Sequence, residues 1–207
     1  MIPGAELAAL LAGRQLLIFD FDGTIADSSP LHEAAFKAVL EPLGVTVDYS
    51  RLGGRSTRDA VLLSYQLNGL PAPAPELVEE LAQRKQELGR ELINNELQVI
   101  PETAALLNWA RPRFLLALVS SGSRATIELS LARLGMNDWF DPVITADEVA
   151  LAKPDPQGFR MALDCKQVRP EAALVFEDAE SGFEAAQRAG IDWVDARNLA
   201  QLMVAER

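Results

Sequence analysis

Two carboxylates near the start of the chain are placed where they could do chemistry. Asp20 and Asp22 stand in Asp20-Phe21-Asp22-Gly23-Thr24, directly after the apolar run Leu16–Phe19. A short, fully apolar run is typical of a buried strand in a parallel sheet. Ligands bind at the carboxyl ends of the strands in open α/β sheets. Two acids at such an end therefore indicate a metal site, a nucleophile, or both.

Phosphoryl transfer would use both acids. A carboxylate can attack phosphorus and form an aspartyl-phosphate intermediate. Because carboxylate and phosphate repel, a divalent cation must bridge them. Asp20 would be the nucleophile and a metal ligand, and Asp22 would face the leaving oxygen, since a second nearby carboxylate tends to have a raised pKa that suits a general acid. The alternative is a plain acidic turn after a strand.

Two further segments offer groups that could bind a phosphate. A second apolar run ends at Ser120-Ser121-Gly122-Ser123, where a hydroxyl followed by backbone N–H groups would form a phosphate cradle at the start of a helix. An N-cap serine is the alternative there. Lys153 stands before Pro154-Asp155-Pro156, and these prolines would fix the loop and hold the lysine at a defined point. A lysine exposed to solvent is the alternative.

A second pair of acids, Glu177 and Asp178, ends another apolar run, and Gly182 follows it. Hard divalent cations prefer carboxylate oxygens as ligands. This pair is therefore a candidate for the cation site that Asp20 would need.

The apolar runs alternate with amphipathic helical patterns, which predicts an α/β fold with a mostly parallel sheet and helices on both faces. The runs are Leu16–Phe19, Phe114–Val119, Val143–Thr145 and Ala172–Phe176, with Trp193-Val194 as a candidate fifth. The helical patterns cover residues 123–134, 156–164 and 179–189.

Residues 30–95 break this alternation, because they show only helical patterns. Pro30 can begin one helix, and Ser56-Thr57-Arg58-Asp59 resembles a capping box before a second. The leucines of a third, long helix recur on one stripe, at Leu77, Leu81, Leu88 and Leu92. We therefore expect a helical insert directly after the first strand.

Composition narrows the class of protein. The chain has 207 residues and a formal net charge of −11, which argues against broad nucleic-acid binding because that requires Lys and Arg on phosphates. We expect no membrane span and no signal peptide, since no apolar stretch approaches about 20 residues and the N-terminus carries no basic segment. Cys165 is the only cysteine, so no internal disulfide can form. We expect it to be a core thiol, and the protein to be cytoplasmic.

Taken in order, these motifs resemble those of the haloacid dehalogenase-like hydrolases, over nearly the whole chain. The resemblance implies a Rossmann-like parallel sheet core with an inserted α-helical cap. The core would comprise residues 1–28 and 97–207, and the cap residues 29–96.

The resemblance also implies roles for the motif residues. Asp20 would be the nucleophile and Asp22 the acid/base, while Lys153 would neutralise the phosphate and the nucleophile. Ser120 would bind the transferring phosphate, with Ser121 as a rival and Gly122 beside them in the turn.

Mg²⁺ is the cofactor that the resemblance implies. Its ligands would be Asp20, the main-chain carbonyl of Asp22, and Asp178, with Glu177 binding directly or through water. The family pattern often has serine after the acidic pair, where this chain has Ala179. That change removes a hydroxyl contact and no metal ligand.

Four residues of the insert are candidate substrate contacts by the same resemblance. His32, the only histidine, could exchange a proton from the first turn of a cap helix. Gly54 would let the backbone approach a ligand, and Arg55 or Arg58 could bind an anionic end of the substrate.

The implied function is a Mg²⁺-dependent phosphatase acting on a small phosphorylated metabolite, a sugar phosphate or a phosphoglycolate-like compound. The alternatives are a β-phosphoglucomutase-like mutase, a dehalogenase, and a non-catalytic binding protein on the same scaffold. Thr57 stands where the mutases typically carry arginine, which weakens the mutase alternative. We expect a monomer or weak homodimer.

Overall fold

A computed structural model of the chain describes residues 1–52 and 55–205, in two compact units. Unit 1 comprises Met1–Asp27 and Gln98–Arg207, and unit 2 comprises Ser28–Leu97. Each unit is described by itself. Gly54, one of the predicted substrate contacts, lies outside the described residues.

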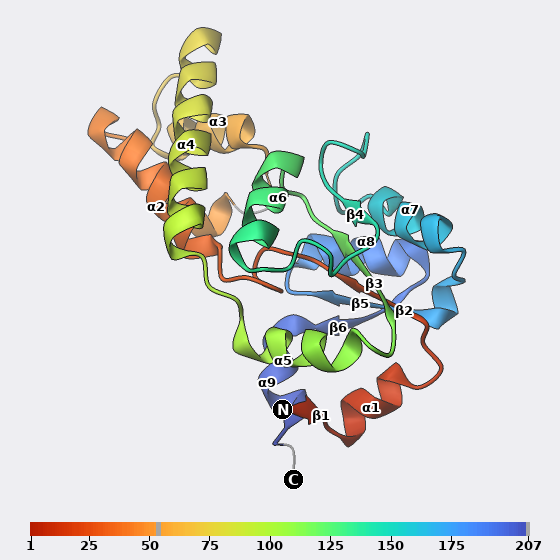
Figure 1. The fold of residues 1–207 in the computed structure, drawn as a ribbon. Coiled ribbons are helices and arrows are strands. Elements are labelled where there is room, and N and C mark those ends of the chain that lie inside the picture. The colour runs from red at the N-terminus through yellow and green to blue at the C-terminus, as the bar shows by residue number, and fades with distance from the viewer. Residues whose placement is uncertain (53–54, 206–207) are drawn as a thin grey trace. The chain divides into compact units, whose positions relative to one another are not determined.

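Unit 1 is built on a five-stranded parallel sheet with the strand order β4-β3-β2-β5-β6 (Figure 1). Its strands in chain order are β2 (Leu16–Phe19), β3 (Leu115–Val119), β4 (Val143–Ile144), β5 (Ala173–Glu177) and β6 (Asp192–Asp195). The predicted parallel α/β sheet is confirmed, with bounds that shift by no more than one residue, as is usual at the ends of elements. The central strand β2 is the one that leads into Asp20.

Alternate side chains of the strands supply the cores on the two faces of the sheet. Leu16 and Ile18 are buried in one cluster with residues of the neighbouring strands and of α7 and α8. On the other face Phe19 stacks on Phe176, with ring centroids 4.7 Å apart, and meets Phe140 edge-on at 6.2 Å. A strand buried on both faces explains why its run is apolar throughout.

The helices of unit 1 lie on both sides of this sheet. Helices α7 and α8 pack together on one face, and Figure 1 shows α5 on the opposite side. The helices are α1 (Ala5–Leu11), α5 (Pro101–Ala110), α6 (Arg124–Arg133), α7 (Gln157–Lys166), α8 (Glu180–Ala189) and α9 (Leu199–Leu202), with 3₁₀ turns at Pro170–Ala172 and Ala196–Asn198. A small antiparallel pair, β1 (Ile2–Pro3) with β7 (Met203–Val204), joins the two ends of the chain.

The described part of unit 2 is helical. It contains α2 (Ser29–Leu40), α3 (Thr57–Leu67) and α4 (Pro75–Glu96), with 3₁₀ turns at Glu41–Leu43 and Tyr49–Arg51. Pro30 lies in the first turn of α2 as predicted. The predicted N-cap of α3 is confirmed, since Ser56 Oγ accepts the Asp59 N–H at 3.1 Å.

The buried face of α4 differs from the predicted leucine stripe. Of the four leucines only Leu81 is fully buried, and the other three are half-buried at the flanks. The face that packs inward instead carries Val78, Leu81, Ala82, Lys85, Gly89 and Ile93. Where α4 packs closely against α2, small residues fit between the helices, and the aliphatic part of a lysine side chain can be buried there.

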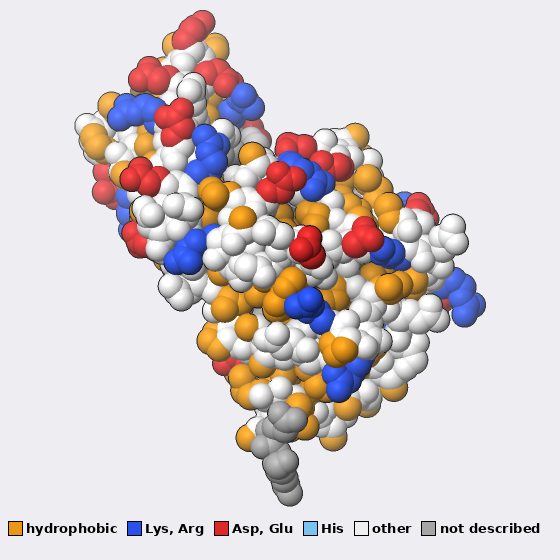
Figure 2. All heavy atoms as spheres, in the orientation of Figure 1, with side chains coloured by type: hydrophobic (Ala, Val, Ile, Leu, Met, Phe, Trp, Pro, Cys, Tyr) orange, Lys and Arg blue, Asp and Glu red, His pale blue; other side chains and the backbone are white. Residues whose placement is uncertain are grey.

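The surface of the protein carries its single cysteine and many charged side chains. Cys165 is exposed on α7, so the prediction of a core thiol is wrong; it lies on the solvent side of an amphipathic helix. Figure 2 shows acidic and basic side chains interspersed over the face in view. Among the described helices, none combines the length and apolarity needed to cross a membrane.

The stacked pair of phenylalanines supports a stability prediction. Truncating the fully buried Phe19 to alanine should lower the free energy of unfolding by about 3–5 kcal/mol, because it removes the stack and leaves a cavity between β2 and β5. Urea unfolding monitored by circular dichroism measures the change. Leu115→Ala is the control: this β3 residue is 46% exposed and its truncation should change stability by no more than about 0.5 kcal/mol. Equal losses in the two variants would contradict the assignment of Phe19 to the core.

Candidate active site

Three strand ends bring the first group of candidate residues together. Phe19 pairs in register with Leu118 of β3 and Phe176 of β5. Asp20 follows β2 directly, and its N–H donates to the Phe176 carbonyl at 3.0 Å. Ser120 directly follows β3, and Glu177 is the last residue of β5. These residues therefore lie at one edge of the sheet, as the sequence predicts.

Lys153 reaches this edge from the loop before α7. Its Nζ donates to Asp20 Oδ1 at 2.6 Å, to Glu177 Oε1 at 2.7 Å and to the Val119 carbonyl at 3.0 Å. Its side chain is only 8% exposed. A buried ammonium bridging two buried carboxylates makes this lysine part of the site rather than a solvent lysine.

Burial and like charge shift the protonation of this cluster. Burial, and next the neighbouring Glu177 carboxylate, raise the pKa of the Asp20 carboxyl well above its ordinary value, although Lys153 opposes them. Burial alone would lower the pKa of Lys153, but the charges of Asp20 and Glu177 outweigh burial and raise it. The lysine is therefore charged, and it favours the carboxylate form of Asp20 that nucleophilic attack requires.

Asp178 completes an acidic group. Oxygen atoms of Asp20, Glu177 and Asp178 all lie within 4.8 Å of one another. Burial, and next the charge of Glu177, raise the pKa of the Asp178 carboxyl to about 6. Three carboxylates that share one ammonium hold an excess of negative charge. A hard divalent cation with oxygen ligands fits this donor set.

The two carboxylates at the end of β5 are held by different partners. Glu177 Oε2 accepts the N–H groups of Asp178 at 2.7 Å and of Ala179 at 3.0 Å. Thr24 Oγ1 donates to Asp178 Oδ1 at 3.3 Å, and the Thr24 carbonyl accepts from Thr103 Oγ1 at 2.7 Å. The threonine of the first motif and a hydroxyl of α5 thus support Asp178.

Two glycines make room for these carboxylates. A Cβ on Gly182 would lie 1.8 Å from Glu177 Oε1, and one on Gly23 would lie 2.2 Å from Asp178 Oδ2. Gly23 also has a φ of +82°, in the left-handed region that favours glycine. The sequence shows both glycines beside the acids, but sequence reasoning missed their contact with the carboxylates and the support from Thr103.

The turn after β3 carries the residues that the sequence predicts to bind a phosphate. Ser120 is 5% exposed, and its Oγ accepts the Gly122 N–H at 2.9 Å, which closes the turn. Ser121 is exposed, and Ser123 caps α6. The Ser120 hydroxyl hydrogen is left to donate elsewhere, as the hydroxyl is both donor and acceptor. Phosphate binding by Ser120, with Ser121 as the rival, stays a prediction.

Asp22 is half-buried, and its side chain is not part of the acidic group just described. Its backbone pairs with Ala26 in an isolated bridge, and Ala26 pairs in turn with Val99. Asp22 therefore lies in a tightly folded turn, and its charge still acts on Asp20, whose pKa it helps to raise.

The remaining predicted residues lie in unit 2. Nδ1 of His32, on α2, lies 3.1 Å from Nζ of Lys85. Arg58 is paired with Glu79, with one N–H···O bond of 2.8 Å, and exposed Arg55 donates to the Arg51 carbonyl at 3.4 Å. Their roles in substrate binding stay predictions.

The raised pKa of Asp178 has a testable consequence for the free energy of unfolding of the metal-free protein, measured in the presence of a chelator. The folded state holds the Asp178 proton more tightly than the unfolded chain, so stability falls as pH rises from about 4 through about 6. Asp178→Asn removes this penalty. Because Asp178 is only half-buried, we expect a gain of about 1 kcal/mol at pH 8 that vanishes near pH 4.

Urea unfolding in the presence of EDTA at the two pH values measures this gain. Asp138→Asn, a change of an exposed acid after α6, is the control and should show no such pH dependence. A gain of the same size at both pH values, or a loss at pH 8, would contradict the repulsive cluster.

Comparison with known proteins agrees with this geometry. The sequence model of the haloacid dehalogenase-like hydrolase family matches residues 17–196. The fructose-1-phosphate phosphatase YqaB of Escherichia coli is 35% identical over 187 residues, which cover 88% of this chain and 96% of that protein. The phosphorylated carbohydrates phosphatase of Thermotoga maritima is 30% identical over 182 residues, which cover 86% of this chain and 82% of that protein.

A solved structure shows the same fold. The crystal structure of CbbY from Rhodobacter sphaeroides in complex with phosphate matches with a TM-score of 0.74 and 29% identity, over 87% of this chain and 84% of that one. The parallel sheet core agrees with this structural match. The chain therefore belongs to the haloacid dehalogenase-like hydrolases, and its relatives place it among the phosphatases of that family.

Proposed function

We propose that this enzyme is a divalent-metal-dependent phosphatase that hydrolyses a small sugar phosphate through an aspartyl-phosphate intermediate. The observation that carries the proposal is the bridge from Lys153 Nζ to Asp20 Oδ1 and Glu177 Oε1, at 2.6 and 2.7 Å, beside a third carboxylate. This cluster supplies a nucleophile, a neutralising cation and oxygen ligands for Mg²⁺ within one site.

The substrate class is inferred from relatives. YqaB is named a fructose-1-phosphate phosphatase, the Thermotoga protein is named for phosphorylated carbohydrates, and CbbY was solved with phosphate. A phosphorylated sugar is the substrate these names share most closely. The proposed site is charged, and its buried Lys153 offers the cation that the phosphate group of such a substrate requires.

In the first proposed step Asp20 attacks phosphorus. A bond forms between an Asp20 carboxylate oxygen and phosphorus, and the bond from phosphorus to the sugar oxygen breaks. Asp22 donates a proton to the departing sugar oxygen, which leaves as an alcohol. Lys153 and the Ser120 hydroxyl bind phosphoryl oxygens and stabilise the charge that spreads over them.

In the second step water releases the phosphate. Asp22, now ionised, takes a proton from water as the water attacks phosphorus, and the bond from phosphorus to Asp20 breaks. Asp20, Asp178, Glu177 and the Asp22 carbonyl would hold Mg²⁺, which when bound screens the repulsion between carboxylate and phosphate.

Unit 2 is proposed to act as the helical cap that selects the substrate, with His32, Arg55 and Arg58 as contacts. Family resemblance supports this role, and the boundary predicted for the cap falls next to the boundary between the two units. A cytoplasmic monomer or weak homodimer stays a prediction.

Replacing the nucleophile is the direct test. Asp20→Asn should lower turnover of sugar phosphates at least about 100-fold, because an amide cannot attack phosphorus. Released phosphate is measured with Mg²⁺ across a panel of sugar phosphates and phosphoglycolate. Asp138→Asn should retain wild-type turnover. Equal activity of Asp20→Asn and wild type would sink the proposal.

The same assay separates the alternatives. A mutase would interconvert phosphate isomers without releasing phosphate, so it would show product isomers and no free phosphate. A dehalogenase needs no metal, and a chelator would leave it active. Binding of sugar phosphates with no turnover on the whole panel would favour the non-catalytic binding protein.

A further inference from the structure

The two segments that carry the proposed phosphate ligands are both irregular. The turn Ser120–Ser123 joins β3 to α6, and the loop with Lys153 runs from the end of β4 to α7. Irregular backbone is not fixed by a repeating hydrogen-bond ladder, so other contacts must order it. Their relative position matters because a phosphate would contact both.

Apolar packing does not set this position alone. A cavity of about 20 Å³ lies beside the two segments, and its lining includes Ser120, Ser121, Ala146, Val149 and Lys153. Facing surfaces that enclose a cavity lack the close contacts that would resist their approach or separation. Polar contacts between the segments then help to define their spacing.

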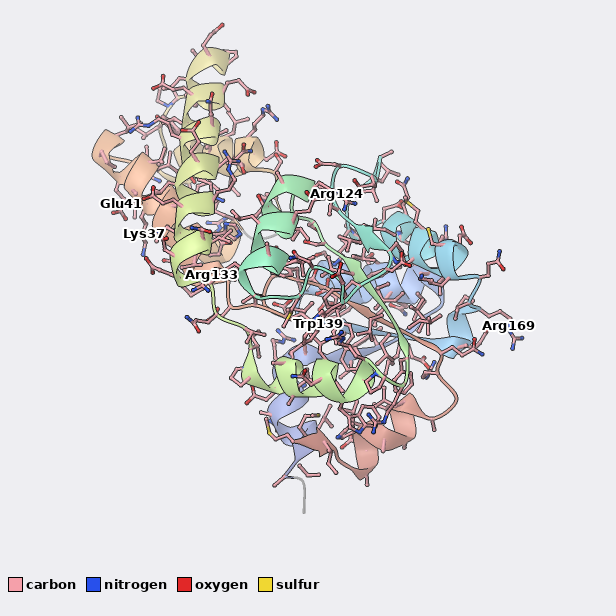
Figure 3. All side chains as sticks on the ribbon, in the orientation of Figure 1. Lys37, Glu41, Arg124, Arg133, Trp139 and Arg169 are labelled. Carbon is pink, nitrogen blue, oxygen red and sulfur yellow. The ribbon has the colours of Figure 1, made fainter. Side chains whose placement is uncertain are left out.

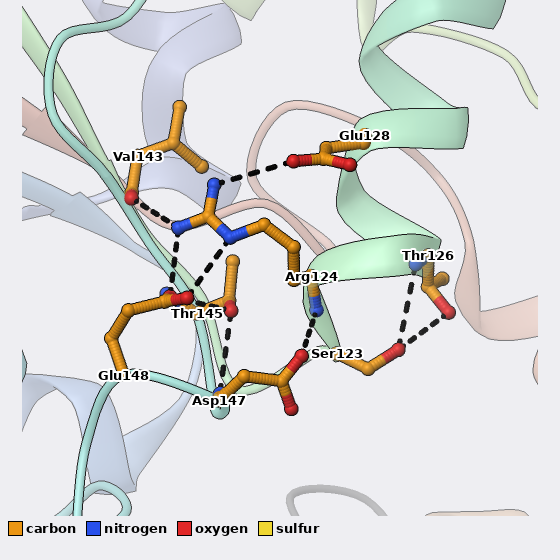
Figure 4. Close-up of polar contacts among 8 residues, drawn as sticks. All are labelled: Ser123, Arg124, Thr126, Glu128, Val143, Thr145, Asp147 and Glu148. Carbon is orange, nitrogen blue, oxygen red and sulfur yellow. Dashed lines mark hydrogen bonds and ion pairs between the residues drawn. The ribbon is translucent and has the colours of Figure 1, made fainter.

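Arg124 makes such contacts from the first residue of α6, where Figure 3 labels it. Its guanidinium binds Glu148 in a two-pronged contact, Nε to Oε1 at 3.0 Å and a terminal nitrogen to Oε2 at 2.8 Å (Figure 4). The same guanidinium donates to the Val143 carbonyl of β4 at 2.8 Å, and it lies 3.6 Å from Glu128. The planar fork of arginine fixes direction as well as distance.

The backbone beside this pair is tied in the same way. The Arg124 N–H, free because it begins a helix, donates to Asp147 Oδ2 at 2.8 Å. Glu148 Oε2 accepts both the N–H and the hydroxyl of Thr145 at 2.7 Å, and the Ala146 N–H donates to the Gly122 carbonyl at 3.0 Å. The start of the Lys153 loop is thus bound to the turn that carries Ser120.

Glu148 is ionised under ordinary conditions. Its hydrogen bond with Arg124 comes first among the causes, and with those from Thr145 it lowers the pKa of the carboxyl to about 2. The pair therefore stays charged at neutral pH. Its side chains are 33% and 32% exposed, so solvent still reaches it.

We propose that the Arg124–Glu148 pair is a positioning device that holds the Ser120 turn and the Lys153 loop at the spacing that phosphate binding requires. It acts through Ser120 and Lys153 and does not itself contact phosphate, because its guanidinium is already bonded to Glu148 and Val143. The inference rests on the proposed function only in taking these two segments as the phosphate site.

Titration of inorganic phosphate into the Mg²⁺-loaded protein by calorimetry tests this role. Arg124→Gln should weaken phosphate binding about tenfold, since small misplacements of binding groups are costly. Glu148→Gln should do the same, and the double variant should bind no more weakly than either, because both remove one interaction. Arg124→Lys should recover only part of the affinity, because its ammonium keeps the charge but cannot form the two-pronged contact.

Arg14→Gln is the matched control. Arg14 also binds carbonyls and an aspartate, with contacts to Glu171 at 2.8 Å and Ala173 at 2.9 Å, but at the amino ends of the strands. This change should lower the melting temperature and leave phosphate affinity unchanged. It separates loss of position from general loss of stability.

Wild-type affinity in both Arg124→Gln and Glu148→Gln would overturn the inference, as would equal weakening by Arg14→Gln. If Arg124→Gln does not fold, Glu148→Gln decides alone. If the wild type turns over sugar phosphates and both variants keep its phosphate affinity, this inference is overturned while the proposed phosphatase activity stands. If the wild type binds phosphate without turnover and the variants bind it more weakly, the positioning role stands and the phosphatase proposal is overturned. If the wild type binds no phosphate, both proposals are overturned.

Discussion

The structure of unit 1 depends on one buried ammonium. Lys153 is placed among carboxylates of Asp20, Glu177 and Asp178, whose mutual repulsion would otherwise oppose folding of the sheet edge. Buried charges are tolerated only when they are paired and hydrogen-bonded. The apolar strands beneath, the backbone N–H groups after Glu177 and the glycines beside the carboxylates all serve that requirement. A divalent cation would neutralise the negative charge that remains after this pairing. The repulsion among the carboxylates that destabilises the fold is therefore also what would bind the metal.

Much of this arrangement could be predicted from the sequence, for identifiable physical reasons. Strands buried on both faces must be apolar throughout, so β2 and β5 stand out as short unbroken runs. Parallel strands end at a common edge, so acids that follow two of them must be neighbours. Helix N-caps such as Ser56 depend on four consecutive residues and are visible locally.

Other features could not be predicted, because they depend on contacts between residues distant in sequence. Nothing local shows that Gly182 lies against Glu177 or that a hydroxyl of α5 supports Thr24. The inward face of α4 was mispredicted because its contact with α2 accommodates Lys85 and Gly89, whereas periodicity favours leucines. The pairing of β1 with β7 joins runs of two residues each, too short to show a period. Cys165 was mispredicted since composition says nothing about which side of a helix a residue takes.

The strand order has a consequence for how the protein is made. The central strand β2 is synthesised early, but its two neighbours, β3 and β5, come much later in the chain. Thr24 and Asp178, which meet at the site, are separated by 154 residues. Contacts of such range form slowly because a long loop must close first. A nascent chain therefore cannot complete the surroundings of Asp20 until β5, the strand that carries Glu177, has been synthesised.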